Sequence, residues 1–167
     1  MKESEQRQIF DEWLQSYQSL LFKVVRAYAY TVNDQDDLFQ DIALQVWNSI
    51  PNFQAKSAVS TWLYRVALNT ALLWLRKEKK HKAVLEKQPQ ILQLRAEAQD
   101  ERLDWLYEEI AKLQELDRML TVLMLDGYSY KEMAQMLGIS EANVGVRIHR
   151  IKKYLTKRAQ NYDYYGV

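Results

Sequence analysis

Six cations and no acidic residue lie within positions 147–158, near the C-terminal end of the chain. They are Arg147, Arg150, Lys152, Lys153, Lys157 and Arg158. Lys and Arg concentrated on one side of a helix commonly neutralise nucleic-acid phosphates. At helical spacing, one face carries Asn143, Val146, Arg147, Arg150 and Lys153, and we expect this face to meet DNA. The alternative is the solvated basic face of an ordinary amphipathic helix pair.

The residues around this face predict how it is positioned. Ser129 and Glu132 have the spacing of a capping box, so a helix is expected to begin at Tyr130. Gly138 is expected to end that helix in a left-handed conformation, and Ser140 to cap a second helix. The apolar face of the second helix is Val144, Ile148, Ile151 and Leu155. Two helices, a tight turn and a run of cations are typical of a helix–turn–helix that enters the DNA major groove.

A second candidate surface lies between Thr61 and Lys80, where no residue breaks a helix. On such a helix Trp62, Arg65, Asn69, Arg76 and Lys80 share one side. An indole beside an amide and cations suits stacking on unpaired bases and binding of phosphate. The alternative is that Trp62 packs against a neighbouring helix and the cations are solvated. Another side is expected to enter the core, with Leu63, Ala67, Ala71, Trp74 and Leu75.

Composition limits the possible classes of protein. Four glycines and two prolines among 167 residues are too few for the turns of an all-β fold, so we expect an all-α protein. The absence of cysteine excludes disulfides and thiolate metal sites and fits a reducing cytoplasm. The first residues are polar and no stretch approaches 18 uninterrupted apolar residues, so neither a signal peptide nor membrane insertion is expected.

Enzyme chemistry finds little support in the sequence. Asp36 and Asp37 are paired carboxylates, but His81 and His149 lie in basic segments without metal-ligand spacing. The chain has no phosphate-binding loop and no pairing of a nucleophile with a base. We therefore expect no catalysis, no metal and no cofactor.

The elements that must carry these surfaces are expected to form two small helical domains joined by a flexible linker. The expected division is a first domain at 1–84, a linker at 85–100, a four-helix domain at 101–160 and a tail at 161–167. In the first domain, one helix is expected from about Phe10 to Tyr30. Another is expected from Asp34 to Ile50, capped by Asn33 and closed by Pro51. In the second domain, Asp117 is expected to cap a helix that ends at Asp126 and Gly127.

Charge alternates in blocks along the chain. Four aspartates and no cation lie between Arg26 and Lys56, whereas six cations and one glutamate lie in 65–82. Eight acids and two cations follow in 97–117, before the basic segment described above. Such blocks are typical of a chain that touches DNA with some segments and protein with others.

Three blocks together resemble the extracytoplasmic-function (ECF) sigma factors of bacterial RNA polymerase. Asp36–Trp47 resembles the helix of the family's first domain that docks on the clamp of the largest polymerase subunits. Phe53–Asn69 resembles the loop and helix that capture an unpaired base of the −10 promoter element. Asp126–Arg150 resembles the helix–turn–helix that reads the −35 element. The chain departs from the family in the loop, where glycine and an aromatic are common and this sequence has Ala55, Lys56 and Val59.

The resemblance implies a role in promoter recognition and transcription initiation, and it assigns residues to three surfaces. Core polymerase would be bound by Asp36, Asp37, Gln40 and Asp41. The −10 element would be bound by Phe53, Lys56, Ser57, Ser60, Trp62, Arg65, Asn69, Arg76, Lys77 and Lys80. The −35 element would be bound by Ser140, Asn143, Val146, Arg147, Arg150 and Lys153, with Asn143, Val146 and Arg147 nearest the base edges. The implied partners are core RNA polymerase, through its clamp and flap, promoter DNA and an anti-sigma factor.

A stand-alone helix–turn–helix regulator is the main alternative. It would need a dimerisation or ligand-binding domain within residues 1–85, where the sequence has neither a heptad seam nor a pocket motif.

Overall fold

The computed structural model describes residues 1–84 and 100–165 and divides the chain into two compact units, Met1–Asp100 and Glu101–Val167. Every regular element among the described residues is a helix, which confirms the predicted all-α class. In the first unit the helices are α1 (Glu3–Ser16), α2 (Gln18–Tyr28), α3 (Val32–Ser49), the short 3-10 helix η1 (Ile50–Asn52) and α4 (Val59–Val84). In the second they are α5 (Glu101–Ala111), α6 (Glu115–Leu125), α7 (Tyr130–Leu137) and α8 (Glu141–Tyr165). Of the predicted linker at 85–100, residues 85–99 lie outside the described residues.

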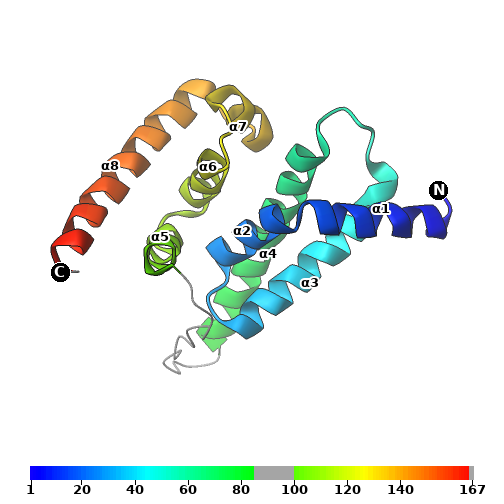
Figure 1. Ribbon diagram of the computed structural model, residues 1–167, viewed down its shortest axis with the longest axis horizontal. Coiled ribbons are helices and arrows are strands. Elements are labelled where there is room, and N and C mark those ends of the chain that lie inside the picture. The colour runs from blue at the N-terminus through cyan, green and yellow to red at the C-terminus, as the bar shows by residue number, and fades with distance from the viewer. Residues whose placement is uncertain (85–99, 166–167) are drawn as a thin grey trace. The chain divides into compact units, whose positions relative to one another are not determined.

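The core of the first unit lies between α2, α3 and α4, which pack against one another (Figure 1). Each helix contributes side chains at intervals of three or four residues, as one buried face requires. The fully buried ones include Leu21, Val24, Leu38, Ile42, Leu63 and Ala67. The predicted apolar side of α4 is confirmed, since Leu63, Ala67, Ala71, Trp74 and Leu75 are all buried.

Two predicted helix boundaries in this unit are wrong. The expected continuous helix from Phe10 to Tyr30 is broken at Tyr17, whose φ of −114° and ψ of 17° are not helical. The two pieces pack on different partners, because α2 buries six side chains in the core whereas α1 contacts α3 and η1 from outside. The cap of α3 is Thr31 rather than Asn33, because the Thr31 hydroxyl accepts a 3.0 Å hydrogen bond from the Asp34 backbone.

The second unit is a four-helix domain, as predicted, with α7 and α8 as its helix–turn–helix (Figure 1). Its core includes Ile110, Leu120, Leu123, Met133, Val144 and Ile148. The buried Arg118 donates from Nη2 to the carbonyls of Ala111 at 2.7 Å and Leu113 at 3.2 Å. These bonds satisfy carbonyls at the C-terminal end of α5 and hold the corner between α5 and α6.

The predicted turn between α7 and α8 is confirmed in detail. The Ser129 hydroxyl accepts from the Glu132 backbone, and the Glu132 carboxylate accepts from the Ser129 backbone at 2.7 Å. Gly138 ends α7 with a φ of +68°, where a residue with a Cβ is strained. The Ser140 hydroxyl accepts from the Asn143 backbone at 3.1 Å and so caps α8.

Candidate nucleic-acid and protein interfaces

The predicted acidic residues of α3 all face solvent. Asp36, Asp37, Gln40 and Asp41 are exposed, whereas Leu38 and Ile42 between them are fully buried. We call these four exposed residues the acidic face of α3. Leu44 continues the same side of the helix and is 55 % exposed. Sequence reasoning missed Leu44, although its position three residues after Asp41 places it on this face. Carboxylates beside an exposed leucine suit a basic protein surface with an apolar contact.

The loop at 53–58 follows η1 and leads into α4. Lys56 is exposed, while Phe53, Ser57 and Ser60 are half-buried. Ala55 has a φ of +52°, a left-handed conformation that costs a residue with a Cβ about 1–2 kcal/mol. Strained backbone is often found where a loop is shaped for binding.

The ring of Trp62 is packed within the protein. Its centroid lies 5.4 Å from that of Trp13 on α1 and 5.2 Å from that of Phe53, and the Trp13 and Phe53 rings are 5.2 Å apart. We call these three residues the aromatic cluster. Trp62 therefore packs against a neighbouring helix, α1, as the alternative interpretation predicted, and it also packs against Phe53 of the loop. Stacking of Trp62 on a DNA base stays a prediction.

Beyond the aromatic cluster, α4 presents a polar stripe to solvent. Arg65, Asn69, Arg76 and Lys77 are all exposed. The backbone of Lys80 belongs to the same helix, but its side chain lies outside the described residues. Leu73, between Asn69 and Arg76 on this stripe, is 59 % exposed. The sequence could have identified it, since it follows Asn69 by four residues.

The outer face of α8 carries the predicted DNA-binding residues. Asn143, Val146, Arg150 and Lys153 are exposed, and Ser140 is exposed at the cap. Val146 is 58 % exposed, and an exposed apolar side chain there suits contact with a thymine methyl group. The opposite face buries Val144, Ile148 and Ile151 against the rest of the unit. The predicted division of this helix into a polar and an apolar side is therefore confirmed.

Arg147 differs from Arg150 and Lys153 because it is bound to another helix of its own domain. Its Nη1 lies 2.8 Å from Oδ1 of Asp117 on α6, and the two side chains are only 24 % and 23 % exposed. Its Nε donates to Oδ1 of Asn143 at 3.1 Å. The predicted capping role of Asp117 is wrong, because α6 begins earlier, at Glu115 with Gln114 as its cap residue. The carboxylate of Asp117 instead bonds to α8.

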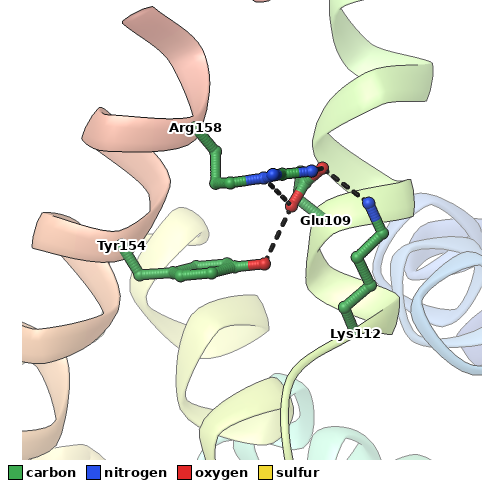
Figure 2. A network of polar contacts seen from close by, with 4 residues as sticks. All are labelled: Glu109, Lys112, Tyr154 and Arg158. Carbon is green, nitrogen blue, oxygen red and sulfur yellow. Dashed lines mark hydrogen bonds and ion pairs between the residues drawn. The ribbon is translucent and has the colours of Figure 1, made fainter. Parts of the chain in front are cut away.

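A buried carboxylate holds the C-terminal part of α8 against α5 (Figure 2). Glu109 is 2 % exposed and accepts hydrogen bonds from Lys112, Tyr154 and Arg158 at 2.8 to 3.1 Å. Burial by itself raises the pKa of Glu109, but the hydrogen bonds from Arg158, Lys112 and Tyr154 outweigh it and lower the pKa to about 2. The ring of Tyr162 adds a contact with Trp105 at 5.4 Å. The basic end of α8 is therefore partly structural.

The described residues contain neither a membrane-spanning helix nor a cluster of metal ligands. Within 1–84 and 100–165, no helix combines the length and hydropathy needed to cross a bilayer. Across the same residues, His, Asp and Glu side chains form no group of three or more that could hold a metal ion.

Two protein-family models match the chain. Sigma-70 region 2 matches residues 13–81, which span the aromatic cluster, the acidic face and the polar stripe. Sigma-70 region 4 matches residues 103–155, which include the helix–turn–helix. Together the two models cover most of both units.

Curated relatives are similar over nearly the whole chain. RNA polymerase sigma factor YlaC of Bacillus subtilis is 29 % identical over 163 residues, covering 89 % of this chain and 92 % of the relative. ECF RNA polymerase sigma factor SigM of Mycobacterium tuberculosis is 30 % identical over 153 residues, covering 90 % and 77 %.

Solved structures share the fold. The sigma factor RpoE of Bartonella quintana, in complex with the anti-sigma factor NepR, superposes with a TM-score of 0.75 at 18 % identity, over 90 % of this chain and 96 % of the other. CnrH, in complex with the cytosolic domain of CnrY, gives a TM-score of 0.68 at 22 % identity, over 93 % and 90 %. With both domain models matched and a relative 30 % identical over most of its length, the chain belongs to the ECF sigma factors, which bind core RNA polymerase and direct transcription initiation.

Proposed function

We propose that this sigma factor binds its partners through three separate surfaces. The acidic face of α3 docks on the polymerase clamp. The loop at 53–58 and the polar stripe of α4 hold the melted −10 strand. The outer face of α8 binds the −35 element.

The observation that carries this proposal is the exposure of the three polar surfaces on helices whose opposite sides are buried. A side chain that stabilises the fold is usually buried, whereas these residues point to solvent from well-packed helices. Binding sites on rigid helices need little ordering when a partner arrives, so less affinity is lost to conformational entropy.

The chemistry of each surface supports its assigned partner. Carboxylates and Leu44 suit a basic protein surface. Arginines and the amide of Asn69 suit a single strand, whose phosphates and base edges are both accessible. Val146 and Asn143 suit base edges in the major groove, while Arg150 and Lys153 suit phosphates.

We infer that the protein works with polymerase in the cytoplasm and confers promoter specificity without catalysing a reaction itself; membership of the ECF sigma factors supports this. An anti-sigma factor would control it by covering the polymerase-binding or DNA-binding surfaces. The structural relative RpoE, solved in complex with the anti-sigma factor NepR, supports this kind of partner.

The test is transcription in vitro with purified core RNA polymerase and a library of promoter fragments with randomised −35 and −10 elements. The wild-type protein should bind core and enrich one promoter class. Asn69→Ala should keep core affinity but lose strand opening, measured by permanganate reactivity of −10 thymines. Asn161→Ala, an exposed asparagine near the end of α8, is the matched control and should open promoters normally.

Two outcomes would contradict the proposal. Tight binding to duplex DNA without polymerase, combined with no initiation on any fragment, would favour a stand-alone regulator. Loss of core binding in Asn69→Ala would mean that α4 serves docking rather than strand opening.

A further inference from the structure

Three side chains from two helices form a continuous polar chain beside the DNA-binding face. Asp117 on α6 accepts from Nη1 of Arg147 at 2.8 Å, and Nε of Arg147 donates to Oδ1 of Asn143 at 3.1 Å. Asn143 itself is exposed in the first turn of α8, where its backbone bonds to Ser140. Asn143 is thus the solvent-facing end of a chain that begins 26 residues earlier in the sequence.

The guanidinium of Arg147 links the position of Asp117 on α6 to the orientation of the Asn143 amide. It is planar and rigid, so an ion pair at Nη1 also sets the direction of the Nε–H bond. Arg147 is partly buried between the helices, which limits its freedom to swing toward a partner. Arg150 and Lys153 are exposed on the same side of α8 and lack this restriction.

The hydrogen bond from Arg147 also decides which end of the Asn143 amide faces outward. Arginine has only donors, so it must meet the amide oxygen rather than the amide nitrogen. The nitrogen, with its two N–H donors, is left free to point away from Arg147. A donor in the major groove bonds to acceptors on guanine, adenine or thymine, whereas the exposed edge of cytosine presents an N–H donor.

We propose that Asp117 and Arg147 are positioning residues that lock Asn143 as a hydrogen-bond donor, so that one position of the −35 element rejects cytosine. This inference rests on the proposed role of α8 in reading that element. It replaces direct base contact by Arg147 with an indirect role. It also makes Asp117, outside the helix–turn–helix, a determinant of specificity.

The experiment measures relative transcription from promoters carrying each of the four bases at each −35 position, with core RNA polymerase. Asn143→Ala identifies the position, because the bias against cytosine should fall there alone by about fivefold or more. Asp117→Asn and Arg147→Gln should each reduce the bias at that same position and leave the other positions' base preferences unchanged. Asn143→Ala combined with Asp117→Asn should lose no more than Asn143→Ala alone, because the two act on one contact.

Glu108→Gln removes an exposed carboxylate from α5 in the same unit and should leave the profile unchanged. Thermal unfolding of every variant shows whether a change in profile reflects loss of fold. A wild-type profile in both Asp117→Asn and Arg147→Gln would overturn the inference, as would equal weakening at every position. Absence of any −35 preference in the wild-type protein would instead contradict the proposed role of α8.

Discussion

The indole of Trp13 on α1 meets the indole of Trp62 on α4 close to edge to face, with ring centroids 5.4 Å apart. Trp13 also meets Phe53 at 5.2 Å, so one residue of α1 contacts both the first residue of the 53–58 loop and the first turn of α4, which follows the loop. Aromatic pairs of this geometry contribute about 0.5–1.5 kcal/mol each beyond the area they bury. We infer that Trp13 stabilises the loop in the shape needed to accept a base.

Trp13→Ala should therefore impair promoter opening while core binding is kept. Permanganate reactivity at −10 should fall, and Trp13→Phe should restore part of it because a ring again supports the loop. Phe10→Ala is the matched control, since Phe10 lies on the same helix but contacts Trp47 at 5.5 Å rather than the loop. Equal loss of opening in the two alanine variants would show that α1 acts only through general stability.

Asp41→Arg should weaken binding to core polymerase by about tenfold or more, because a cation would face the basic surface proposed for the clamp. Fluorescence anisotropy with labelled protein measures the affinity at several salt concentrations. Glu12→Arg makes the same charge change at an exposed position on α1 and should have little effect. Unchanged affinity for Asp41→Arg would remove the acidic face from the docking surface.

Glu109→Gln should destabilise the second unit by about 1–3 kcal/mol at neutral pH, because the hydrogen bonds from Arg158 and Lys112 lose their charged, buried acceptor. The folded-state pKa of Glu109, about 2, lies below its ordinary value of 4.5. Its stabilising contribution is therefore complete above about pH 4.5 and is lost as the pH falls toward 2.

Urea unfolding followed by NMR signals from α5 and α8, between pH 7 and pH 2, checks this effect in the second unit. The difference between wild type and Glu109→Gln should shrink as the pH falls through that window. Glu108→Gln, one residue away and exposed, should stay within about 0.5 kcal/mol of wild type. A constant difference down to pH 2 would mean that Glu109 acts by shape rather than by charge.

Two glycines of the helix–turn–helix should respond to alanine in opposite directions. Gly138→Ala should destabilise the second unit by about 1–2 kcal/mol, because Gly138 is left-handed. Gly145→Ala should stabilise it by up to about 1 kcal/mol, since Gly145 is helical and a new Cβ would make an ordinary 3.6 Å contact with the Tyr130 ring. Urea unfolding measures both changes. Destabilisation by Gly145→Ala would show that the contact between α7 and α8 is tighter than this distance indicates.

Features that depend on a few neighbouring residues could be predicted from the sequence. The capping box of Ser129 and Glu132 and the left-handed turn at Gly138 follow from hydrogen bonds and steric limits within one or two helical turns. The buried and exposed sides of α4 and α8 follow from helical periodicity. These local rules were enough to predict the all-α fold class, and the motifs in the same segments were enough to indicate the correct family.

Which partners the side chains have inside the protein depends on how distant segments pack, and the sequence did not predict it. Trp62 shares one side of α4 with an amide and cations, as a base-stacking site would, yet its ring meets Trp13, which lies 49 residues away in the sequence. Arg147 has the position of a base reader, yet it bonds to Asp117 on another helix. The break at Tyr17 and the burial of Glu109 likewise depend on what packs against them. Helical periodicity shows which way a side chain faces, but packing between distant segments decides whether it meets protein or solvent.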